Sequence, residues 1–157
     1  MNKNEEVVAV MRDVIKQLNV GTIIATSGVY IERTDGGEYS ESPPRLNQEI
    51  LNSPNPPQCD VCAKGAIFLS SVRNLNKYDD EAPMCSGIEY HLVGTLGLFT
   101  TRAIDEIESV FELYRIHADT PFGRLTDDHR LRWICNYIID HDGEVNGLEE
   151  AAFEYED

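Results

Sequence analysis

Two cysteines, Cys59 and Cys62, stand at a spacing used by metal-binding and thiol-redox sites. Zinc prefers four ligands, and a Cys-x-x-Cys pair usually works with a second pair elsewhere in the chain. The second pair available here would be Cys85 and His91, which is not the spacing of a standard zinc knuckle. A zinc site of these four residues is therefore one hypothesis that the sequence raises.

The same cysteines allow two other interpretations. A redox Cys-x-x-Cys should follow a strand and open a helix, but Pro56 and Pro57 come shortly before Cys59. Free cysteine is among the most buried residue types. We therefore interpret Cys59 and Cys62 as small apolar residues at the start of a packed helix, and we expect no cofactor. A small enzyme with Cys62 or His141 in a pocket is kept as a further alternative.

An acidic turn near the end of the chain is similar to a calcium-binding loop over residues 142–147. Its twelfth position would be Phe153, where such loops require a bidentate glutamate. His141 and Asp142 also resemble the metal-binding dyad of HD-type phosphohydrolases, yet too few residues follow for the third ligand. We interpret the segment as a solvated acidic turn.

No phosphate-binding loop, nucleophile elbow or zinc-protease motif occurs in the sequence. Arg124, Arg130 and Arg132 cluster near one another, but nearby acids outnumber them, so a local salt-bridged surface is expected rather than a nucleic-acid site. Trp133 and Tyr137 are four residues apart. They would form either an exposed aromatic patch or, as we favour, packing at the edge of the core.

Acidity is the strongest compositional signal. The 157 residues contain 28 acidic and 13 basic side chains, a net charge of −15. Residues 101–157 hold 15 acids and 5 bases, a net charge of −10, and no Lys or Arg follows Asp140. Such a surface repels nucleic acids and anionic membranes and attracts basic surfaces, although it also serves solubility alone.

Apolar periodicity predicts amphipathic helices over residues 3–18, 101–114 and 126–141, a buried helix over 59–75, and a short last helix that includes Leu148 and Tyr155. Short β-branched runs over 23–25 and 29–31 predict one or two strands, with a possible hairpin through Asp35-Gly36. Residues 88–100 fit a strand or a helix equally well.

These elements predict one α+β domain, mainly helical, with a small β-hairpin or sheet. Residues 38–58 form a Pro-rich loop and residues 140–157 an acidic C-terminal segment. The sequence shows no apolar run long enough for a membrane span, and its first residues lack the pattern of a signal peptide. We therefore expect a cytoplasmic protein.

The segment Cys62-Ala63-Lys64-Gly65-Ala66 and the later amphipathic helix that ends near Gly143 resemble a group of small phage and bacterial proteins with a CAxGA helix. The resemblance covers about half of the chain and carries over no catalytic residue. It implies a phage setting, where small acidic proteins often inhibit host restriction, CRISPR or repair complexes. It thereby implies an anti-CRISPR or DNA-mimic type of role.

The charge distribution, joined to that resemblance, favours binding over catalysis. We expect the chain to occupy a basic, nucleic-acid-binding surface of a host protein, without binding nucleic acid or membrane itself. The residues expected at this contact are Asp105, Glu108, Glu112, Glu149, Glu150, Glu154, Glu156, Trp133 and Tyr137.

Overall fold

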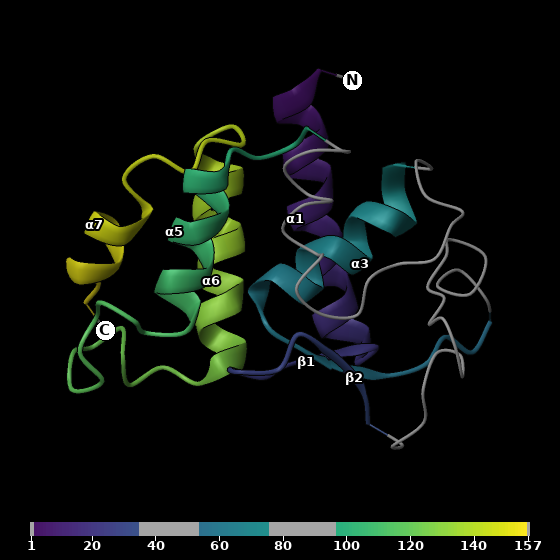
Figure 1. Cartoon of the computed structure of the whole chain (residues 1–157), viewed down its shortest axis with the longest axis horizontal. Helices are drawn as coiled ribbons and strands as arrows, with labels where there is room; N and C mark the ends of the chain where they lie inside the picture. Colours follow the sequence, from purple (N-terminus) through teal and green to yellow (C-terminus); the bar gives the residue numbers. More distant parts are fainter. Residues whose placement is uncertain (1, 35–53, 76–96, 157) are drawn as a thin grey trace.

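The computed structural model describes residues 2–34, 54–75 and 97–156. Within these ranges the chain forms five helices and three short strands (Figure 1). The α+β, mainly helical prediction is therefore confirmed. No helix of the described part is both long enough and apolar enough to cross a membrane.

Helix α1 (Lys3–Val20) lies at the centre of the molecule and packs against both α3 (Ala63–Leu75) and α6 (Asp127–Asp140) (Figure 1). The side chain of Asn2 caps its first turn by accepting a hydrogen bond from the backbone N–H of Glu5. Its apolar stripe, which includes Val10, Met11 and Val14, is fully buried. The predicted amphipathic helix is confirmed and extends two residues further.

The sheet lies at the C-terminal end of α1 and has the strand order β1-β3-β2. The strands are β1 (Ile23–Ala25), β2 (Ile31–Arg33) and β3 (Cys59–Val61). Strand β3 pairs in parallel with β1 and antiparallel with β2. β1 and β2 are consecutive in the sequence, but β3 lies between them in the sheet.

Helices α5 (Thr101–Phe111), α6 and α7 (Leu148–Phe153) form the other side of the molecule. Thr126 caps α6 as predicted, because its hydroxyl oxygen accepts a hydrogen bond from the backbone N–H of His129. One hydrophobic core joins side chains of all five helices and of the sheet.

Four predicted boundaries are wrong. Strand β2 spans Ile31–Arg33 and not residues 29–31, and α7 ends at Phe153, before Tyr155. Residues 59–61 form strand β3 and not the first turn of a helix, because they pair with both neighbouring strands. The helix that begins at Thr101 ends at Phe111, since Leu113 adopts a left-handed backbone conformation with φ of 59°. Tyr114 therefore leaves the apolar stripe and is 71% exposed.

Several predicted features lie outside the described residues. These are the hairpin at Asp35-Gly36, most of the Pro-rich loop 38–58, the strand or helix over most of 88–100, and the two residues Cys85 and His91.

Candidate functional site

The most concentrated group of reactive side chains lies where α3 begins and α5 passes it. Cys62 stands between the end of β3 and the first residue of α3. Glu108 lies on α5, and Glu112 is the C-cap residue of the same helix. Because the two residues are four positions apart, their side chains lie on the same side of the helix. The sulfur of Cys62 and one oxygen of each carboxylate lie within 4.8 Å of one another. We call Cys62, Lys64, Glu108 and Glu112 the Cys62 cluster.

Two members of the cluster are withdrawn from water. Cys62 is 2% exposed and Glu108 is 8% exposed. Burial, followed by the charge of Glu108, raises the pKa of the Cys62 thiol to about 12. The backbone N–H groups of Gly65 and Lys64 act in the opposite direction and lower this pKa. Burial also raises the pKa of Glu108, although the Cys62 thiol and the Lys64 ammonium favour its charged form. The thiol is therefore neutral near pH 7 and lies beside the Glu108 carboxyl group.

Both carboxylates of the cluster are oriented by other groups. The ammonium of Lys64 lies 3.8 Å from Glu108 Oε2 and 5.0 Å from the centre of the Tyr30 ring. The backbone N–H of Gly28 donates to both oxygens of Glu112, at 2.8 and 2.9 Å. The cluster thus holds two carboxyl groups and one ammonium in fixed positions.

Two tyrosines lie at the solvent side of the cluster. Tyr30 is 39% exposed and Tyr114 is 71% exposed. The pKa of the Tyr114 hydroxyl is raised by partial burial and then by the nearby charges of Glu112 and Glu108. The Cys62 cluster therefore lies inside a partly aromatic rim.

The structure gives the two cysteines of the Cys-x-x-Cys spacing different neighbours. Cys59 is buried in β3 and its thiol contacts the carbonyl oxygen of Pro57 at 3.7 Å. Cys59 belongs to strand β3, whereas Cys62 follows the strand and precedes the first residue of α3. Among the described residues, Cys62 is grouped with carboxylates and not with Cys59. Sequence reasoning missed these carboxylates because it assigned Glu108 and Glu112 to the surface of α5.

The expected acidic face of α5 needs a correction. Asp105 is exposed, but Glu108 is buried against the start of α3, and Glu112 is half-buried with both oxygens bonded to Gly28. The rotation of α5 that buries Ile104 and Ile107 also carries Glu108 inward. Glu108 cannot form part of an exposed contact surface.

Trp133 and Tyr137 pack at the edge of the core, the alternative that the sequence favoured. The Trp133 ring lies 5.0 Å from Phe122, 5.7 Å from Tyr137 and 6.2 Å from Tyr155. The Tyr137 hydroxyl donates to the carbonyl oxygen of Asn146 at 2.7 Å. Both side chains are half-buried and contact other residues of the chain, so they form no exposed patch.

The exposed aromatic residue of this region is Phe153, which is 52% exposed at the end of α7. The sequence analysis did not select Phe153 as a contact residue. The predicted apolar stripe of the last helix does not include Phe153, and this could have indicated that its side chain is exposed. Glu150, Glu154 and Glu156 beside it are exposed, and Glu149 is half-buried. We call these five residues, together with Asp105, the acidic terminal face.

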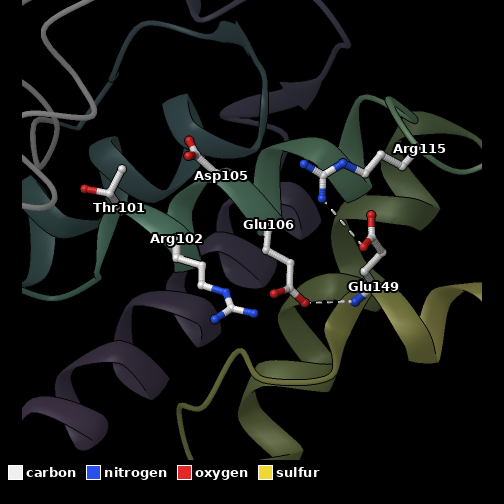
Figure 2. A pocket seen from close by; sticks show the side chains of 6 residues that line it. All are labelled: Thr101, Arg102, Asp105, Glu106, Arg115 and Glu149. Carbon is white, nitrogen blue, oxygen red and sulfur yellow. Dashed lines mark hydrogen bonds and ion pairs between the residues drawn. The ribbon is translucent and has the colours of Figure 1, made fainter.

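A cleft of about 510 Å³ connects Asp105 with α7 (Figure 2). Glu149 contributes to its wall: its backbone N–H donates to Glu106 at 3.0 Å, and its carboxylate lies 3.8 Å from the Arg115 guanidinium. Arg102 and Thr101 complete the lining. The cleft is lined by three carboxylates and two guanidinium groups, so it can accept a polar or charged side chain.

The acidic turn at 142–147 packs against the first turn of α1. The Glu144 carboxylate accepts a hydrogen bond from the Asn4 side chain at 3.0 Å, and Gly143 lies against the Asn4 backbone. His141 stacks on Tyr137 with ring centres 3.9 Å apart. Within the described part of the chain, potential metal ligands gather at the Cys62 cluster and not here. The exposed Asp142 and Glu144 agree with the interpretation as a solvated acidic turn, whereas Gly143 and Val145 are buried.

Two of the three clustered arginines form the predicted ion pairs, whereas the Arg124 guanidinium donates to the backbone carbonyl of Asp119. The guanidinium of Arg130 is buried and contacts Asp127, and Arg132 pairs with Asp128 at 2.7 Å.

Comparison of the chain with protein-family models, with curated proteins and with solved structures gives no match. The resemblance to small phage and bacterial proteins stays a prediction. The role of these residues is therefore inferred from their own geometry and charge.

Proposed function

We propose that the protein binds a basic surface of another protein through the acidic terminal face. The observation that carries this proposal is the exposure of Phe153 on α7 among acidic side chains, in a segment with no Lys or Arg after Asp140. Protein interfaces commonly combine a buried aromatic anchor with a polar rim. Phe153 would be the anchor and the carboxylates the rim.

The charge of this face favours a partner with a positive surface. Residues 101–157 carry a net charge of −10, and Arg130 and Arg132 within them are paired with neighbouring aspartates. Complementary charge speeds association and selects partners, and its effect weakens as salt concentration rises. The resemblance to phage proteins favours a host nucleic-acid-binding protein, whose DNA site the acidic face would occupy in the cytoplasm.

Affinity purification from host cell extract, followed by mass spectrometry, identifies the partner, and the purified pair then tests the mechanism. Affinity should fall as salt is raised, and excess duplex DNA should displace the protein. Binding that is equally tight at low and high salt would contradict the proposal, and so would simultaneous binding of DNA and protein.

The decisive variant replaces Glu149, Glu150, Glu154 and Glu156 with glutamine. The matched control neutralises four acids elsewhere, namely Glu5, Glu32, Asp119 and Asp140, which are all exposed. Both variants change the net charge equally. The first should bind much more weakly than the second, whereas equal losses would show that only the overall charge matters.

A further inference from the structure

We propose that Cys62, Glu108 and Glu112 bind one zinc ion, with the fourth coordination position filled from outside these three side chains. The proposal concerns the Cys62 cluster and does not depend on partner binding by the acidic terminal face.

The three donors already converge. Cys62 comes from the β3–α3 junction, and the two glutamates come from successive turns of α5, yet their donor atoms all lie within 4.8 Å of one another. The ligand atoms of a tetrahedral zinc ion lie about 3.5 Å apart. Closing the site therefore requires the donor atoms to move by about 1 Å toward one another.

The donor types select the metal. Zinc accepts both thiolate sulfur and carboxylate oxygen, whereas calcium and magnesium take oxygen ligands. Three protein ligands with one remaining position is the arrangement of open zinc sites. On binding, the sulfur of Cys62 forms a bond to zinc and its proton is released to solvent.

The surroundings of the donors suit a divalent cation. A thiolate and two carboxylates beside the Lys64 ammonium leave a net negative charge on these side chains, and one Zn²⁺ brings them to neutrality. The backbone N–H of Gly28 holds Glu112, and Lys64 contacts Glu108. Such outer contacts orient metal ligands.

The cluster differs from the zinc site that the spacing of the cysteines suggested. That site would use Cys59, whose thiol contacts the Pro57 carbonyl and which is not among the three converging donors. Cys62 is the cysteine shared by the two hypotheses. Replacing Cys59 and Cys62 separately therefore distinguishes them.

Cobalt titration of tag-free, chelator-treated protein tests the proposal. Co²⁺ replaces Zn²⁺ and gives a near-ultraviolet charge-transfer band when a thiolate binds it. We expect this band to saturate at one equivalent of Co²⁺ and to disappear when Zn²⁺ is added. Absence of the band at stoichiometric cobalt would overturn the proposal, as would weak binding that needs a large excess of metal.

Variants then identify the ligands. Cys62→Ser should abolish the band, whereas Cys135→Ser, which alters another buried thiol, should leave it unchanged. Glu108→Gln and Glu112→Gln keep the thiol, and each should weaken zinc binding by at least about 10-fold. Survival of the band in Cys62→Ser, or its loss in Cys59→Ser alone, would refute the assignment.

Folding of each variant is checked by circular dichroism. If Cys62→Ser fails to fold, thiol alkylation of the wild-type protein replaces it as the test. Under mild denaturant, one equivalent of Zn²⁺ should protect Cys62 from alkylation much more than Cys59 or Cys135. Equal protection of all three thiols would instead indicate general stabilisation of the fold and would count against the site.

Discussion

Gly65, in the first turn of α3, lies directly against the backbone carbonyl of Tyr30. A Cβ atom at Gly65 would stand 2.9 Å from the carbonyl carbon of Tyr30 and closer still to its oxygen. This approach brings the start of α3, with Cys62 and Lys64, beside the segment that connects β1 and β2. The Cys62 cluster therefore depends on the absence of a side chain at position 65.

Gly65→Ala should lower the free energy of unfolding by about 3 kcal/mol, because the backbone of Tyr30 cannot move aside without disturbing the sheet. Urea unfolding measures the loss. Gly21→Ala is the control: Gly21 has open space around it but a φ of 83°, so strain alone should cost about 1 kcal/mol. Equal losses in the two variants would contradict a steric role for Gly65.

The sequence predicts the long helices well because their apolar periodicity is local. The α1 stripe and the Thr126 cap of α6 are both present as expected. The close approach of Gly65 to the Tyr30 backbone, in contrast, joins segments that are far apart in the sequence.

Strand β3 and the Cys62 cluster are not predictable in the same way, because they depend on pairs of residues far apart in the sequence. Three residues carry too little pattern to reveal β3, which is defined by its pairing with β1 and β2. Glu108 looks like a surface residue until the rotation of α5 against α3 is known. Charge and spacing alone could not place it beside Cys62.

Asp127 makes a pH-dependent contribution to stability. Burial opposes its ionisation, but hydrogen bonds from the backbone and hydroxyl of Ser27, and then the Arg130 guanidinium, outweigh burial and lower the pKa of Asp127. A carboxyl group with a lowered folded pKa stabilises the fold above its unfolded pKa of about 4, and this contribution is lost as the pH falls through the folded value. Asp127→Asn should therefore cost about 1–2 kcal/mol at pH 7 and less below about pH 4.

Urea unfolding of the wild type and of Asp127→Asn at pH 7 and pH 3 measures this difference. Asp128→Asn is the neighbouring control, because Asp128 and Arg132 form a more exposed ion pair worth at most about 1 kcal/mol. A loss for Asp127→Asn that is the same at both pH values would show that charge plays no part.

Tyr155 shields the only tryptophan of the chain, so its removal should be visible by fluorescence. Its ring lies 6.0 Å from Phe122 and 6.2 Å from Trp133. Tyr155→Ala should shift the emission of Trp133 to longer wavelength and cost about 1 kcal/mol or more. Phe153→Ala, two residues away and exposed, should leave the emission unchanged. A shift in both variants would mean that the last residues detach from α6 as a unit.

Phe153 should matter for binding and not for folding. Because its side chain is 52% exposed, Phe153→Ser should change the free energy of unfolding by no more than about 0.5 kcal/mol. If Phe153 is the anchor of the acidic terminal face, the same change should weaken partner affinity by about 10-fold or more. Urea unfolding and titration of the purified partner give the two values. Tyr114→Ser, which alters an exposed aromatic residue at the Cys62 cluster, is the matched control. A larger loss of affinity in Tyr114→Ser would move the interface from α7 to the rim of that cluster.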